Sequence, residues 1–440
     1  MKTRLFLLSL LVTAVYSTGN AQQVYDKKDC IATGLERNYS LLVSRNSEAI
    51  AENNYTIGNA GYLPTLDLSG RHNGTLNDLR TNVGDTSSTI TRNIHNTTSS
   101  GSLSLGLTIF DGFSVTTTYR KLGELKKIGT LNTQLAIENL VADIVAGYYN
   151  YIQQVRLLNN LKYAVSLSKE RLRIDEDRYF LGSSSKLQVL QSKVYLNADS
   201  SRLSKQYETV HAAQIRLNEL MAVDDLNGQF VTRDTTIDVN QQILYEKLLE
   251  ETLANNTSLQ IASANKTISE YDYRLAKSRS YPYLTASSGY NYNFNTFSNS
   301  TNTNQQTNGL SYGLTLGVNL FDGFNQRRSI NNSSIELQSK ELRYKEMEQG
   351  VKADLITIYS AYSNFLRLIE LEKQNLQTAT ENLTIAMERY KLGNLSGIDL
   401  REVQKSLLDA RESLLSVQYQ TKLSEISLNL IAGRIMDYYK

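Results

Sequence analysis

The residue types that most often carry catalysis or metal binding are few and scattered in this chain of 440 residues. The histidines His72, His95 and His211 lie far apart in the sequence, and Cys30 is the single cysteine. They form neither a HExxH zinc motif nor a cysteine pair, and the sequence has no P-loop, dinucleotide glycine fingerprint or GxSxG nucleophile elbow. We therefore expect no catalytic residue, no metal site and no cofactor, and interpret the protein as a non-enzyme.

Residues 1–21 predict a secretory signal peptide, because Lys2 and Arg4 precede an apolar run and the segment ends in small residues. Without these two cations, 44 of the 46 basic residues remain, equal to the 44 acidic residues. A neutral chain lacks the basic face of nucleic-acid binders, so we expect no nucleic-acid partner. Beyond the signal no apolar run reaches the ~18 residues of a spanning helix, so entry into a membrane would require strands.

The chain repeats itself once. The sequence Phe-Asp-Gly-Phe at 110–113 recurs at 321–324, and further matches keep the same offset of 211 residues for more than a hundred positions. We interpret this as a tandem duplication of one structural unit. The predicted organisation is a first repeat over 22–222, a linker with a small irregular region over 223–241, and a second repeat over 242–440.

Each repeat contains a segment in which large apolar residues alternate with small polar ones. From Leu103 to Ile109, and from Leu310 to Leu320, this alternation is typical of a strand with one apolar and one polar face. Partner strands follow Pro64 and Pro282, so each repeat holds one strand hairpin. The hairpins are expected over 65–111 and 283–321, with polar loops near 77–99 and 296–308.

The expected strands are about ten residues long, as in a transmembrane barrel. The same alternation also fits a half-buried soluble sheet. Four strands cannot close a barrel by themselves, because even small barrels use about eight. In either case several chains must combine their strands.

The remaining sequence is helical. Between Gly112 and Leu181, and again between Gly323 and Leu392, there is no proline and the apolar residues follow helical spacing. Spacings of four and three residues predict helix-on-helix packing of the coiled-coil type. The seam consists of Ile137, Val141, Ile144, Tyr148, Tyr151, Val155 and Leu158, and in the second repeat of Leu355, Tyr359, Tyr362, Leu366 and Ile369.

Each long helix is expected to end where an arginine is followed by Gly182 or Gly393. New helices then begin with the patterns Ser185-x-x-Gln188 and Ser396-x-x-Asp399, which resemble capping boxes. They are expected to return over 186–222 and 398–432. Each repeat thus contains a helical hairpin with a tight tip, near 182 and near 393. Further helices near 30–60 and 242–280 precede the prolines.

Over essentially its whole mature length the chain resembles the TolC family of outer-membrane efflux proteins. The resemblance rests on the duplication, the helix-proline-strand junctions, the Phe-Asp-Gly-Phe corners and the glycine tips. It implies a mixed α and β, TolC-like fold in which long α-helical hairpins form a periplasmic helical barrel. Four strands per chain would join a homotrimer's 12-stranded transmembrane β-barrel in outer-membrane lipid.

The resemblance also implies the function: a passive outer-membrane duct with porin activity, in a tripartite efflux or type I secretion system. The expected partners are a periplasmic adaptor protein and, through it, an inner-membrane pump. The expected location is the outer membrane of a Gram-negative bacterium, with the helices extending into the periplasm. The alternative is a non-conducting outer-membrane receptor or adhesin with a coiled-coil stalk.

Site residues are carried over to matching positions near the tips. In that family, acidic residues beyond the second tip narrow the tunnel. The positions six and nine residues beyond the tip glycine are Asp399 and Glu402 in the second repeat, and Gln188 and Gln191 in the first. Tyr390 fits the family's gating region, whereas Leu395 stands where an arginine is common. The alternative is that Asp399 caps its helix and Glu402 is a solvated side chain. The residues expected to contact the adaptor are Leu181, Gly182, Ser183, Leu392, Gly393 and Asn394. The alternative is that they only form the turns.

Overall fold

The computed structural model describes residues 23–84, 87–298 and 303–439, so the predicted signal peptide lies outside the described residues. The chain divides into two compact units. The helical unit contains the described residues up to Asn46, Leu131–Gln260 and the described residues from Glu346 onward. The strand unit contains Ser47–Thr130 and Ile261–Lys345. Each unit takes segments from both sequence repeats, because the long helices pass from one unit into the other.

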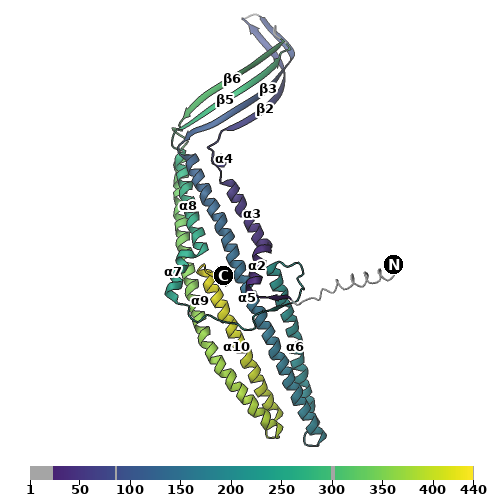
Figure 1. Cartoon of the computed structure of the whole chain (residues 1–440). Helices are drawn as coiled ribbons and strands as arrows, with labels where there is room; N and C mark the ends of the chain where they lie inside the picture. Colours follow the sequence, from purple (N-terminus) through teal and green to yellow (C-terminus); the bar gives the residue numbers. More distant parts are fainter. Residues whose placement is uncertain (1–22, 85–86, 299–302, 440) are drawn as a thin grey trace, which may run out of the picture. The chain divides into compact units, whose positions relative to one another are not determined.

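The strand unit contains one antiparallel sheet of four strands. They are β2 (Thr65–Val83), β3 (Ser87–Asp111), β5 (Tyr283–Thr296) and β6 (Asn304–Gly317), in the order β2-β3-β5-β6 (Figure 1). The central pair, β3 with β5, joins the two repeats, with Leu103 opposite Tyr290. The two hairpins therefore form one continuous sheet within a single chain.

The strands are longer than the sequence predicted. They contain 19, 25, 14 and 14 residues, so the expected length of about ten was wrong. The expected polar loop near 77–99 was also wrong, because β2 and β3 remain paired up to Val83 and Ser87. In the second hairpin β5 ends at Thr296 and β6 begins at Asn304, and β6 ends at Gly317, short of the expected end at 321. Polar residues extend a strand when a ladder satisfies their backbone groups and their side chains bond across it, as Arg80 Nε does by donating to Ser88 Oγ at 3.2 Å.

The helices that precede the prolines are interrupted, contrary to the continuous helices expected near 30–60 and 242–280. The first segment comprises α2 (Lys27–Arg37), α3 (Tyr39–Asn54) and α4 (Ile57–Ala60), and the second comprises α7 (Tyr245–Asn255) and α8 (Thr257–Ser278).

The first break in each segment falls on an asparagine, Asn38 or Asn256. Their Oδ1 atoms accept hydrogen bonds from the Leu41 and Leu259 amides, and their Nδ2 atoms donate to the carbonyls of Leu220 (3.0 Å) and Ile431 (2.9 Å). An asparagine side chain that binds nearby backbone groups competes with the helix, so the break occurs there.

Two helical hairpins extend through the helical unit. Helices α5 (Ser114–Phe180) and α9 (Asn325–Lys391) have 67 residues each, and they return as α6 (Lys186–Met221) and α10 (Gly397–Ile431). The short helix η1 (Ile435–Tyr438) follows α10. No helix in the described part of the chain is sufficiently long and apolar to cross a membrane.

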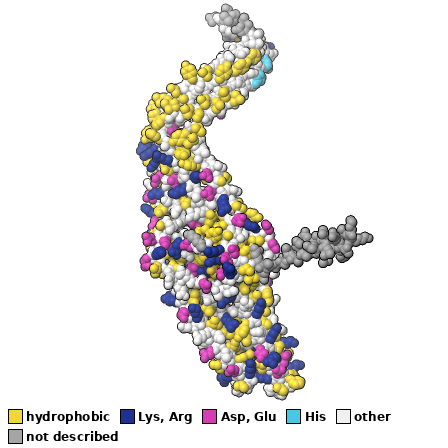
Figure 2. Space-filling view, viewed as in Figure 1, with side chains coloured by type: hydrophobic (Ala, Val, Ile, Leu, Met, Phe, Trp, Pro, Cys, Tyr) yellow, Lys and Arg dark blue, Asp and Glu magenta, His cyan; other side chains and the backbone are white. Residues whose placement is uncertain are grey.

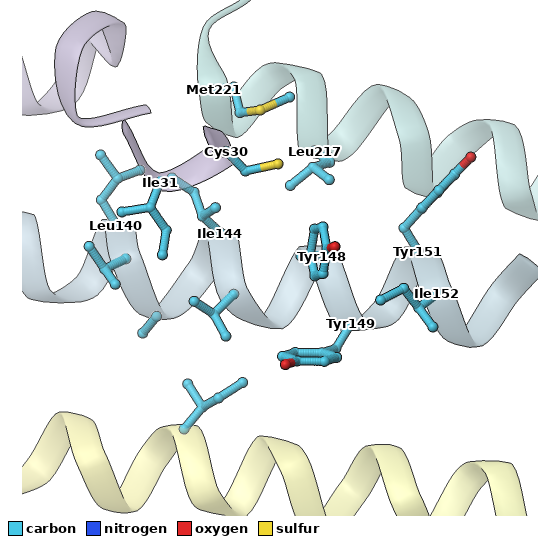
Figure 3. Close-up of a cluster of buried hydrophobic side chains, with 14 of the residues drawn as sticks. Cys30, Ile31, Leu140, Ile144, Tyr148, Tyr149, Tyr151, Ile152, Leu217 and Met221 are labelled. Atoms are coloured by element: carbon cyan, nitrogen blue, oxygen red, sulfur yellow. The ribbon is translucent and has the colours of Figure 1, made fainter. Parts of the chain in front are cut away.

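The main core of the helical unit surrounds α5. Ile144 and Tyr148 are fully buried, and Tyr151 and Ile152 nearly so, together with Leu217 and Met221 of α6 (Figure 3). The predicted heptad seams are confirmed, because each seam residue is buried or partly buried. The expected linker contains β4 (Phe230–Thr232), which pairs in parallel with β1 (Gln23–Tyr25) and places Phe230 against Tyr151.

The Phe-Asp-Gly-Phe corners fold alike in the two repeats. Gly112 and Gly323 have φ of 66° and 70°, and the following Phe113 and Phe324 have φ of 70° and 64°. The aspartate in each corner caps the helix by accepting from a backbone N–H four residues later, at 2.9 and 2.8 Å. Two successive left-handed residues turn the chain into a long helix, directly after β3 in the first repeat and after irregular residues that follow β6 in the second. This shared turn explains the recurrence of the sequence.

Candidate docking and constriction site at the helical hairpin tips

The two hairpin tips are tight turns built around a left-handed glycine. Gly182 has φ of 73° and Gly393 has φ of 84°. Beyond each glycine the next amide donates back to an arginine carbonyl, from Ser183 to Arg178 at 2.8 Å and from Asn394 to Arg389 at 2.9 Å. These bonds satisfy carbonyls that the helix end leaves free. The predicted arginine-then-glycine helix stops are therefore confirmed.

The tips surround a groove of about 820 Å³. Seven of the residues predicted from the sequence line it: Ser183, Gln188, Tyr390, Leu392, Gly393, Asn394 and Asp399. Leu181, Gly182, Gln191 and Glu402 lie outside its lining. The structure thus brings predicted adaptor and constriction residues together at one end of the helical unit.

The tips expose large apolar side chains that helix packing would otherwise bury. Leu181 is 77% exposed and Leu392 is 76% exposed. Phe180 (91%), Leu187 (72%) and Ile398 (64%) are exposed in the same way, and the sequence reasoning missed them. The signal for them was large apolar residues on either side of a glycine stop. Such a surface favours docking to another protein.

The two carboxylates beyond the second tip are both exposed. The Asp399 amide donates to Ser396 Oγ at 3.1 Å, and the Ser396 hydroxyl donates to Asp399 Oδ2 at 2.7 Å. Only the serine half of the predicted capping box is therefore formed, and the aspartate stabilises the cap through the serine hydroxyl. Glu402 has no ion pair or hydrogen bond with any residue in the described ranges.

The glutamines of the first repeat interact locally. The Gln188 side chain accepts a hydrogen bond from the Ser184 hydroxyl through Oε1. The Gln188 backbone N–H donates to Ser185 Oγ at 3.4 Å. Gln191 donates to the Tyr195 hydroxyl at 3.2 Å. Both side chains are uncharged. Of the four residues predicted to narrow the tunnel from beyond the tips, only Asp399 and Glu402 can therefore carry negative charge.

Tyr390 lies in the packing between the two hairpins and is only 2% exposed. Its hydroxyl donates to Asp175, its carbonyl accepts from Arg178, and the Arg178 guanidinium lies 4.8 Å from the centre of its ring. Burial, reinforced by the hydrogen bond to Asp175, raises the pKa of the Tyr390 phenol. This residue therefore fixes one hairpin against the other within the chain.

A second buried connection joins α6 to α10, and the sequence reasoning missed it. The Arg401 guanidinium donates two hydrogen bonds to the Asp199 carboxylate, at 2.7 and 2.8 Å, and Ser168 donates a third at 2.5 Å. Burial opposes ionisation of Asp199, but these hydrogen bonds outweigh it and hold the pKa of its carboxyl below the ordinary range. Such charge-assisted bonds fix both distance and orientation.

The missed polar residues do carry a sequence signal. On α6 the buried residues Ser192, Asp199, Gln206 and Ala213 recur every seven positions. On α5, Ser168, Arg171 and Asp175 continue the buried spacing of Leu161 and Val165. Polar residues that occupy a heptad seam face a partner helix and must be satisfied there.

The sheet of the strand unit has two chemically different faces. One row, Leu68–Leu103–Tyr290–Leu310, crosses all four strands through paired positions, with exposures of 82%, 44%, 50% and 69%. Hydrophobic side chains gather along the sheet in Figure 2. The neighbouring row, which points to the other face, consists of Ser69, Ser102, Asn291 and Gly309. One face of the sheet therefore carries large apolar side chains, and the other carries small or polar ones.

The described residues contain no cluster of three or more histidine, cysteine, aspartate or glutamate side chains that could hold a metal ion. The histidines instead make isolated contacts. His72 Nδ1 lies 2.8 Å from Ser99 Oγ, and His211 Nε2 lies 2.7 Å from Asn227 Oδ1.

Comparison with known proteins gives one family. The sequence model of the family described as "Outer membrane efflux protein" matches residues 31–223 and 248–434. Outer membrane efflux protein BepC of Brucella suis is 23% identical over 226 residues, 51% of this chain and 48% of that protein. Outer membrane protein TolC of Vibrio cholerae is 23% identical over 234 residues, 50% of this chain and 52% of that protein. The chain spans about half the length of the curated relatives it matches.

Solved structures share the fold at low sequence identity. A membrane protein from Pseudomonas aeruginosa has a TM-score of 0.77 with 16% identity, over 94% of this chain and 91% of that one. The Campylobacter jejuni CmeC outer membrane channel has a TM-score of 0.74 with 16% identity, over 93% and 85%. The outer membrane protein VceC of Vibrio cholerae has a TM-score of 0.72 with 16% identity, over 92% and 96%. The predicted TolC-like mixed α and β fold class is confirmed.

Proposed function

Because this chain belongs to the outer membrane efflux protein family, we propose that it works as a passive trimeric duct across the outer membrane. The chain is an outer-membrane protein. In the proposed assembly, a periplasmic adaptor and an inner-membrane transporter deliver substrates to the duct, which carries them through the periplasm and out of the cell.

The observation that carries the proposal is the row Leu68–Leu103–Tyr290–Leu310. These side chains are exposed although they are large and apolar. A face of this kind is stable against lipid, while the small polar side chains behind it are stable against water. The sheet therefore has the two-faced chemistry of a wall between membrane and aqueous lumen.

The open edges of the sheet support assembly from several chains. Neither β2 nor β6 has a second partner strand among the described residues. Unpaired strand edges are unstable in lipid, where no water satisfies the backbone, so the sheet has to close. Three copies would supply twelve strands, with β2 of one chain beside β6 of the next.

The tips support the proposed contact with an adaptor. Exposed Leu181 and Leu392 flank turns whose backbones are held by their own hydrogen bonds, so the turns are preformed for docking. The residues proposed to touch the adaptor are Leu181, Gly182, Ser183, Leu392, Gly393 and Asn394.

The proposed constriction lies beside the tips. Three chains would each contribute Asp399 and Glu402, and carboxylates held close together favour cations and repel each other. Gln188 and Gln191 complete the proposed constriction, and the buried Tyr390 supports it by fixing the hairpin that carries Asp399 and Glu402 against the other. The capping contact of Asp399 leaves its charge in place, so capping and constriction are compatible roles.

The test is single-channel conductance of the purified protein in planar bilayers. Wild type is expected to give small cation-selective currents, and Asp399→Ala/Glu402→Ala larger and less selective ones. Asp409→Ala is the matched control, since it removes an exposed carboxylate farther along the same helix. Stable insertion with identical currents in all variants would show that Asp399 and Glu402 do not form the constriction. Failure of the wild type to conduct would overturn the duct.

A further inference from the structure

The guanidinium of Arg171 on α5 is buried and makes no direct ion pair with the described residues. Its side chain is fully buried, with 0% exposure, and no carboxylate of the described residues forms an ion pair with it. Its Nε and Nη2 atoms have no hydrogen-bond partner, and Nη1 only approaches Gln404 Oε1 at 3.5 Å. Nε and Nη2 form the edge of a guanidinium that normally binds an anion through two parallel bonds. The anion-binding edge of Arg171 is thus buried and unused.

The carboxylate of Asp175 attracts the Arg171 charge but gives its guanidinium no hydrogen bond. Arg171 and Arg401 lie on the same tyrosine ring, with their guanidinium carbons 4.6 and 5.1 Å from the centre of Tyr195. Asp199 is engaged by Arg401 and Ser168. Asp175, one helical turn from Arg171, is engaged by Ser192 and Tyr390. Both nearby carboxylates therefore have other donors.

A second unused donor lies beside the first. Gln404 of α10 is 5% exposed, and its Nε2 atom has no partner. Gln404 also lines a small cavity of about 20 Å³, together with Arg202, Arg401, Lys405 and Arg411, whereas Arg171 lies outside the lining. No carboxylate lines this cavity. A space of this size holds roughly one water-sized particle or ion.

From these contacts we propose that Arg171 and Gln404 form a buried binding site for one small inorganic anion of about the size of chloride. A buried guanidinium without an acceptor is strongly unfavourable, and a bound anion supplies both acceptor and charge. The carboxylate of another chain cannot reach this edge, because Arg171 is covered within its own chain. The bound anion bridges α5 of the first hairpin to α10 of the second.

The first test is crystallographic. Crystals of the wild-type protein are soaked in sodium bromide, and anomalous scattering is recorded at the bromine edge. The expected result is a bromide peak within hydrogen-bond distance of Arg171 Nε and Nη2. An ordered water in that place, with no bromide peak, overturns the proposal.

The second test measures thermal unfolding in detergent by circular dichroism. The series replaces gluconate, which is too large for the site, by chloride at constant ionic strength. Wild type is expected to unfold at a temperature that rises with chloride and then saturates, as linkage requires. Arg171→Gln should lose this rise. Arg173→Gln, on the exposed side of the same helix, should keep it.

Should Arg171→Gln fail to fold, Gln404→Leu replaces it, because this variant removes the second donor and leaves the arginine in place. Its chloride response is expected to shift to higher concentration. A response that is the same in wild type and in the variants overturns the site. The readouts are scattering and stability, so the proposed duct can fail without deciding this proposal.

Discussion

The hydroxyl of Tyr390 donates a hydrogen bond to Asp175, a residue 215 positions earlier in the chain. The bond is buried and joins α9 of the second hairpin to α5 of the first. Asp175 accepts another bond from Ser192, so one carboxylate connects three helices. The contact between the hairpins is therefore polar at its centre, although Leu383, Leu400 and other apolar side chains surround Tyr390.

Removal of this hydroxyl should loosen the two hairpins. We expect Tyr390→Phe to lower the free energy of unfolding by about 1–3 kcal/mol, because Asp175 keeps a buried oxygen with one fewer donor. Chemical denaturation followed by circular dichroism measures the change. Tyr179→Phe is the control, since Tyr179 is 48% exposed at the same tip. Equal effects of the two substitutions would refute a special role for the Tyr390 hydroxyl.

The Asp199–Arg401 pair predicts a dependence of stability on acid. The folded protein lowers the pKa of Asp199, so the stability from this group is complete above the unfolded pKa of about 3.9 and is lost as pH falls through the folded pKa. The difference in melting temperature between wild type and Asp199→Asn should stay constant above about pH 5 and narrow below about pH 4. Melting curves from neutral to acidic pH measure it.

The control for this prediction is Asp177→Asn, which changes an exposed carboxylate one turn from the tip. Its difference from wild type should vary little with pH. If the Asp199→Asn difference stays constant to the lowest pH at which the protein remains folded, the carboxylate is not stabilised by its partners.

Glycine has opposite roles at two positions of the hairpins. Gly182 has φ of 73° and no atom within 4 Å of an added Cβ, so Gly182→Ala should destabilise by about 1 kcal/mol through backbone strain alone. Gly350 lies within α9 and is equally open, so Gly350→Ala should stabilise by about 0.5–1 kcal/mol. Paired unfolding curves test both. Changes of the same sign would contradict the left-handed turn at the tip.

Cys30 should be inert in the folded protein. The thiol is fully buried against α5 and α6, and burial, with the nearby Asp29 and Asp26, raises its pKa to about 12. Thiolate is the reactive form, so labelling by a maleimide at pH 8 should be negligible until denaturant is added. Ser183→Cys gives the positive control, because that side chain is exposed at the tip. Fast labelling of the native wild type at Cys30 would contradict the burial.

Much of the architecture could be predicted from local pattern alone. The two-residue alternation around Leu103 and Leu310 identified strands, the heptad spacing from Ile137 to Leu158 identified the buried side of α5, and the glycines identified the tips. These features depend on backbone geometry and on which side of an element is apolar. Both are determined by residues that lie a few positions apart in the sequence. The proposed constriction and adaptor residues stay predictions, because one chain contains neither the other copies nor the adaptor.

The tertiary structure decided what local pattern leaves open. The length of β2 and β3 through their polar ends depends on pairing between strands, and the break at Asn38 depends on the distant Leu220 carbonyl. The buried Asp199 and Arg171 occupy seam positions, which indicate that a residue faces a neighbour but not which atoms meet it. A buried polar group is stable only with its actual partners, and those are brought together by the fold.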